Sequence, residues 1–154
     1  YETDHDYTLN IIGIDELKKQ HHKRLAHQLD IKIHGKILER QPFYEKLARN
    51  DVVVLPAIAE RQSRVIIEAM SVGVVPICTD TGGVYTVIQN YYNGLLFPEN
   101  DVEKLASQID KVTDNPDLYK DLQANGLDYV ESLDYDKYIT KTSKIIRNYW
   151  NYRG

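Results

Sequence analysis

The chain has 154 residues, a mass of 17.9 kDa, and 42% hydrophobic and 27% charged residues, which is the composition of an ordinary one-domain globular protein. A net charge of −4 and a pI near 5.7 argue against non-specific binding of nucleic acid. The sequence has no run of about eighteen apolar residues, which is the length needed to cross a bilayer. The one cysteine, Cys78, excludes an internal disulfide framework and favours a reducing compartment, so we expect a cytoplasmic location.

Short apolar runs alternate with amphipathic segments along the chain. The apolar runs predict strands at Tyr7–Gly13, Ile31–His34, Val52–Leu55, Val74–Thr79 and after the turn Asn93-Gly94. The amphipathic segments predict helices at Asp15–Leu29, from Gln41, at Ser63–Ser71, around Tyr85–Gln89, and at Asp101–Thr113, Pro116–Leu133 and Asp136–Trp150.

This alternation predicts the fold class, because strands separated by helices form βαβ units with parallel pairing. Right-handed crossovers then produce a Rossmann-like, doubly wound parallel sheet with helices on both faces. Ligands of such sheets bind at the carboxyl ends of the strands. That rule selects the loops Gly13–Glu16, Gly35–Leu38, Pro56–Arg64 and Thr79–Gly83.

Two glutamates flank the start of the helix that follows the third predicted strand. Glu60 precedes the helix, and Glu68 lies more than one turn inside it. The first backbone N–H groups of a helix lack internal acceptors and favour anions such as phosphate. Carboxylates beside a phosphate site suit a nucleotide-sugar, because they accept hydrogen bonds from sugar hydroxyls. The spacing alone also fits a capping carboxylate and an exposed helix carboxylate without a ligand.

The segment from Glu60 to Pro76 reads E-R-Q-S-R-V-I-I-E-A-M-S-V-G-V-V-P. It resembles the E-x7-E signature of the group-one, family-four retaining glycosyltransferases, which have the GT-B fold. The resemblance continues through Thr79-Asp80-Thr81-Gly82-Gly83 and Asn93-Gly94-Leu95-Leu96-Phe97-Pro98, and it covers roughly residues 9 to 113. It implies a donor-binding domain that serves transfer of a hexose from a nucleoside diphosphate, UDP or GDP, in glycan, polysaccharide or glycolipid synthesis.

The resemblance also implies roles for individual residues. Glu68 matches the glutamate that binds the ribose hydroxyls, and Glu60 matches the glutamate that contacts the transferred sugar near the reacting centre. The other implied donor contacts are the backbone amides of Ser63, Arg64 and Val65 at the diphosphate, Lys36, Ile37 and Leu38 against the nucleobase, and Gly13 at the end of a strand. Such enzymes need no metal, since basic residues and a helix end take the charge.

Three departures from the family pattern bear on these expectations. Arg61 and Gln62 replace the usual small or aromatic residues, and Thr86 stands where a glutamate is common. In the family, an acceptor-binding domain and a further strand and helix precede the strand that ends at Gly13. We therefore expect residues 1–154 to be one donor-binding domain of a longer protein, inactive alone, with 134–154 as its tail helix and with any membrane contact made through the missing domain.

Other interpretations stay open at this point. A nucleotide-sugar 2-epimerase shares the sheet and a ribose-binding glutamate, and a non-catalytic nucleotide-binding module would share the fold. His21, His22 and His27 have no metal-ligand spacing, so a metal site is not expected. The predicted strand at Leu9–Gly13 carries no lysine or proline to protect an edge, so it could mediate self-association.

Overall fold

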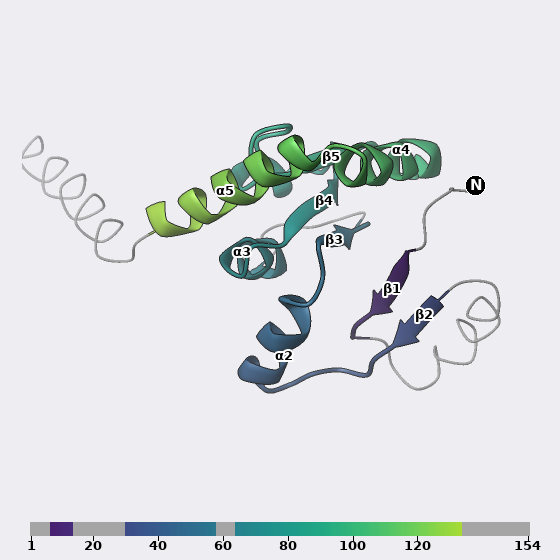
Figure 1. Ribbon diagram of the computed structural model, residues 1–154, viewed down its shortest axis with the longest axis vertical. Helices are drawn as coiled ribbons and strands as arrows, with labels where there is room; N and C mark the ends of the chain where they lie inside the picture. The colour runs from purple at the N-terminus through teal and green to yellow at the C-terminus, as the bar shows by residue number, and fades with distance from the viewer. Residues whose placement is uncertain (1–6, 14–29, 58–63, 134–154) are drawn as a thin grey trace, which may run out of the picture. The chain divides into compact units, whose positions relative to one another are not determined.

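The computed structural model describes residues 7–13, 30–57 and 64–133 (Figure 1). The chain divides into two compact units, Tyr1–Arg49 and Asn50–Gly154. The helices predicted at Asp15–Leu29 and Asp136–Trp150 lie outside the described residues. None of the helices in the described ranges has the length and apolar character needed to cross a membrane.

The first unit contains two parallel strands and a helix. β1 (Thr8–Ile11) pairs with β2 (Asp30–Ile33), and α2 (Arg40–Leu47) follows. The Thr8 hydroxyl donates a 2.7 Å hydrogen bond to the Asp30 carboxylate at the start of the register, and this bond lowers the pKa of Asp30. Among the described strands, β1 pairs with β2 alone. Self-association through the other edge of β1 stays a prediction.

The second unit contains a three-stranded parallel sheet in the order β3-β4-β5. These strands are β3 (Val52–Leu55), β4 (Val75–Thr79) and β5 (Leu95–Phe97). β4 is buried along its whole length, as expected for the middle strand of a parallel sheet. Its second residue, Pro76, is tolerated because pairing with β5 begins only at Ile77, so no strand hydrogen bond is lost there.

In the described part of this unit, three α-helices and a short 3₁₀ turn pack around the sheet. α3 (Arg64–Ser71) follows β3, η1 (Val84–Thr86) follows β4, and α4 (Val102–Thr113) and α5 (Pro116–Ser132) follow β5. Asp101 and Asn115 cap α4 and α5, because their side chains accept the backbone N–H groups of Lys104 and Leu118. The helix predicted around Tyr85–Gln89 is only a single 3₁₀ turn, displaced toward Gly83.

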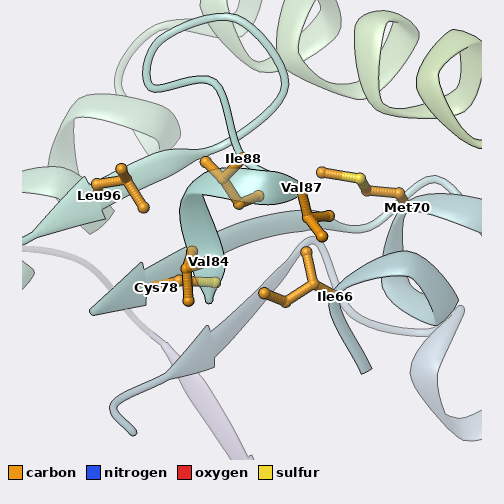
Figure 2. Packing of buried hydrophobic residues seen from close by; sticks show 7 residues of the cluster. All are labelled: Ile66, Met70, Cys78, Val84, Val87, Ile88 and Leu96. Carbon is orange, nitrogen blue, oxygen red and sulfur yellow. The ribbon is translucent and has the colours of Figure 1, made fainter. Parts of the chain in front are cut away.

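The sheet of the second unit is covered on both faces, as predicted. One face buries Cys78 and Leu96 against α3 and η1, and Figure 2 shows this cluster. The other face buries Ile77 and Leu95 against α4 and the first half of α5. Alternation along β4 and β5 sends neighbouring side chains to opposite faces, which explains why each strand contributes to both clusters. Buried Cys78 is a packing residue, in agreement with the sequence interpretation.

The hydrogen bonds of the described strands define a parallel sheet within each unit. The parallel direction was predictable because every connection carries a helix or a long segment. The pairing was not, since apolar periodicity shows which faces are covered and leaves the neighbour of each strand open.

Candidate donor-binding site

The carboxyl ends of β3, β4 and β5 form one edge of the second unit's sheet. The register places Leu55 beside Cys78 and Thr79 beside Phe97. The Thr79 hydroxyl donates to the Leu55 carbonyl at 3.4 Å, and the Asp80 N–H donates to the Phe97 carbonyl at 2.8 Å. In doubly wound folds this edge holds the ligand.

α3 follows β3 beyond this edge and carries the glutamate that the sequence singles out. Its buried residues are Ile66, Ala69 and Met70. Arg64 and Glu68 are four residues apart, so they share the opposite face of the helix. Glu68 is half-buried and Arg64 is exposed. The helix therefore holds the Glu68 carboxylate away from the apolar core.

The start of α3 supplies the other predicted feature of this site. Arg64 and Val65 are its first two described residues, and the first N–H groups of a helix are the ones that can bind an anion. Two predicted site residues, Glu60 and Ser63, lie outside the described residues. Contact of the Arg64 and Val65 amides with a diphosphate stays a prediction.

The predicted site residues of the first unit lie after β1 and β2. Gly13 follows β1 with φ of +92°, a backbone conformation that strains other residues, and its N–H donates to the Gly35 carbonyl at 3.4 Å. A Cβ at Gly13 would meet nothing within 4 Å, so conformation and not space selects glycine. In the loop after β2, Lys36 is exposed, Ile37 is half-buried and Leu38 is 90% exposed.

His34 lies directly after β2 and is satisfied within the first unit. Its Nε2 lies 3.0 Å from Asn10 Oδ1, and its backbone N–H donates to the Ile11 carbonyl at 2.7 Å. Burial lowers the pKa of His34, and the positive charges of Lys46 and Lys32 lower it further. The interpretation of His34 as a satisfied histidine at the rim is therefore confirmed, and sequence reasoning missed only its partner, Asn10.

The turn after β4 contains residues that sequence reasoning did not assign. Asp80 is exposed, and interaction with its carboxylate raises the pKa of the Tyr85 hydroxyl. Thr86, which occupies the position of a common family glutamate, bonds to the Gly83 carbonyl at 2.8 Å. Tyr129 of α5 donates to the Thr86 carbonyl at 3.1 Å. Thr86 thus has a structural role in holding the turn.

The second unit therefore has a parallel α/β architecture. Its parallel sheet is covered on both faces, and the helix that follows β3 carries Glu68 on the face opposite its buried residues. Residues 1–128 match the family described as Glycosyl transferases group 1, so the chain belongs to that family. The fold expectation is confirmed, because solved structures that match this chain are GT-B glycosyltransferases.

One relative is an uncharacterized glycosyltransferase of Haemophilus influenzae, which is 30% identical over 135 residues. The match covers 84% of this chain and 36% of the relative. Sucrose-phosphate synthase from Thermosynechococcus elongatus superimposes with a TM-score of 0.76 at 22% identity, covering 94% of this chain and 39% of that protein. Anabaena Alr3699/HepE in complex with UDP-glucose gives a TM-score of 0.73 at 22% identity, covering 89% and 40%. The chain thus spans well under half the length of each.

Proposed function

We propose that this chain is the donor-binding domain of a retaining glycosyltransferase that transfers a hexose from a UDP- or GDP-sugar to an acceptor hydroxyl. The observation that carries the proposal is the position of Glu68. Glu68 is half-buried and lies on the face of α3 that points away from the apolar core. α3 follows β3, whose carboxyl end belongs to the edge where ligands bind in such folds. A carboxylate in this place can accept hydrogen bonds from both ribose hydroxyls of a nucleotide.

The remaining site residues take roles around the same ligand. The first amides of α3, from Ser63, Arg64 and Val65, stabilise the negative charge of the departing diphosphate. Glu60 contacts the transferred sugar and positions it for reaction. The loop of Lys36, Ile37 and Leu38 packs against the nucleobase, and Gly13 permits the backbone turn beside it.

The likeness to Anabaena Alr3699/HepE in complex with UDP-glucose supports a nucleotide-sugar as the ligand. The limited coverage of the relatives supports a longer protein, in which the acceptor-binding domain lies outside this chain. In this proposal the chemistry needs no metal, because helix amides and basic residues balance the diphosphate charge.

The proposal is tested by isothermal titration of the protein at its natural length with UDP, GDP and ADP. Binding of UDP or GDP in the micromolar range, with ADP weaker, is expected. Absence of binding by all three nucleotides, from a protein shown to be folded by circular dichroism, would reject the nucleotide-sugar donor. Turnover of a bound nucleotide-sugar into products would separate a transferase from a non-catalytic module, and release of a free 2-epimeric sugar would indicate the epimerase.

Glu60→Gln is expected to lower turnover about ten-fold in the enzyme at its natural length, since it removes one charge-assisted hydrogen bond to the transferred sugar. The affinity for the nucleoside diphosphate itself stays within two-fold (about 0.4 kcal/mol), because the side chain faces the sugar. Steady-state kinetics and a UDP or GDP titration measure the two quantities. Collapse of nucleotide affinity in this variant would show that the roles of Glu60 and Glu68 are wrongly assigned.

A further inference from the structure

The turn after β4 holds two side chains that the proposed donor contacts do not use. Asp80 follows the strand directly and is exposed, and Tyr85, in η1, is 58% exposed. Interaction with the Asp80 carboxylate raises the pKa of the Tyr85 hydroxyl. The pair therefore presents an apolar ring and a charged acceptor next to each other on the surface.

This pair lies at the ligand edge of the sheet. The Asp80 N–H bonds to the Phe97 carbonyl, and the neighbouring Thr79 hydroxyl bonds to the Leu55 carbonyl. These two bonds tie the turn to the carboxyl ends of both β5 and β3. Since β3 leads toward α3, the pair is one strand away from the part of the sheet that carries Glu68.

The residues on either side of Tyr85 are held firmly in place. Val84 is 2% exposed and packs in the apolar cluster shown in Figure 2. The Thr86 hydroxyl donates to the Gly83 carbonyl, and the Thr86 carbonyl accepts a hydrogen bond from the Tyr129 hydroxyl. An exposed ring on such a fixed segment loses little conformational freedom when it binds a ligand. Within the described part of the chain, the buried Thr81 hydroxyl of the same turn has no hydrogen-bond partner, which is uncommon for a buried polar group in a native protein.

We infer that Asp80 and Tyr85 bind a pyranose ring at this edge. A pyranose has a face of C–H groups that packs on an aromatic ring, and hydroxyls that donate charge-assisted hydrogen bonds to a carboxylate. The inference rests on the proposed function, because the ring belongs either to the sugar of the donor or to a sugar of the acceptor. Both sources share the same recognition chemistry.

The experiment separates these sources with two probes on the protein at its natural length. In the donor arm, titrations with UDP-glucose and UDP, and in parallel with GDP-mannose and GDP, measure how much the attached sugar adds to affinity. In the acceptor arm, NMR titration with methyl α-glucopyranoside measures binding of a free sugar ring. The variants are Tyr85→Ala, Tyr85→Phe and Asp80→Asn, and the matched control is Tyr92→Ala, since Tyr92 is 47% exposed in the turn that precedes β5.

Tyr85→Ala and Asp80→Asn are each expected to reduce the sugar contribution about five-fold in one arm, and the arm that responds identifies the source. Tyr85→Phe retains the aromatic ring, so its sugar contribution to affinity is expected to lie between that of Tyr85→Ala and that of the wild type. Binding of UDP and GDP and the melting temperature stay unchanged, as does every quantity in Tyr92→Ala. The inference is overturned if neither arm responds, if the wild type shows no sugar contribution, or if UDP and GDP lose affinity equally. Failure of the wild type to bind any nucleotide would instead reject the proposed function.

Discussion

Replacing Gly94 by alanine is expected to destabilise the second unit by about 2–3 kcal/mol, the upper part of the range for forcing an extra group into a packed core. A Cβ at this position would lie 2.8 Å from Ile88 Cδ1, 2.9 Å from Pro76 Cγ and 2.9 Å from the Pro76 carbonyl oxygen. Ile88 is buried in the apolar cluster, and the carbonyl belongs to the central strand β4. The Pro76 ring and carbonyl cannot move away without displacing β4, whatever the Ile88 side chain does.

The residues before Gly94 explain why the local backbone cannot adjust instead. Asn93 is 2% exposed, its amide donates to the Val87 carbonyl at 3.0 Å, and its side-chain oxygen accepts the Gln89 N–H at 2.8 Å. The Gly94 carbonyl itself accepts the Tyr91 N–H at 2.9 Å. The side-chain hydrogen bonds of Asn93 therefore fix the start of β5, and Gly94 allows the close approach of β4 because it has no side chain.

Thermal unfolding followed by circular dichroism, with hydrogen exchange of the β4 and β5 amides, measures this effect. Gly94→Ala is expected to melt roughly 5–10 °C below the wild type. Gly82→Ala is the matched control, because a Cβ at Gly82 meets nothing within 4 Å, and its effect is expected to stay within about 0.5 kcal/mol. Equal stability of the two variants would contradict the close packing at Gly94.

Local patterns in the sequence predicted much of this fold. The strand at Val52–Leu55 has the predicted bounds, because an apolar run lies between Asp51 and Pro56. The face of α3 was also predictable, since apolar residues three and four apart must turn to the sheet and leave Glu68 outside. For these elements the decisive interactions are local in the chain.

Features that depend on distant contacts were not predictable in the same way. The need for glycine at position 94 arises from Pro76 and Ile88, which approach it only after the sheet has formed. The Asp80–Tyr85 pair depends on η1 being a single turn, and the periodicity predicted a longer helix. Tyr91 adopts φ of +63°, where its hydroxyl bonds to Gln108 and Lys111 of α4, and no turn motif in the sequence indicates this.

Glu68→Ala is expected to weaken UDP or GDP binding at least ten-fold. Loss of charge-assisted hydrogen bonds to the two ribose hydroxyls removes about 1.5–3 kcal/mol. The helix itself should persist, because alanine is the best helix former and the bond from the Ser71 hydroxyl uses the backbone carbonyl of Glu68, which remains. Titration calorimetry measures the affinity, and Glu131→Ala, an exposed glutamate of α5, serves as the matched control with unchanged binding.

A nucleotide that lacks one ribose hydroxyl distinguishes direct contact from a general electrostatic effect. If the Glu68 carboxylate accepts from the ribose, 2′-deoxy-UDP binds the wild type more weakly than UDP does, whereas Glu68→Ala binds both nearly equally. The two changes are then strongly non-additive, as expected when they remove the same hydrogen bond. Additive losses would show that Glu68 does not contact the ribose. Unchanged UDP and GDP affinity in a folded Glu68→Ala variant would remove the observation on which the proposed donor site depends.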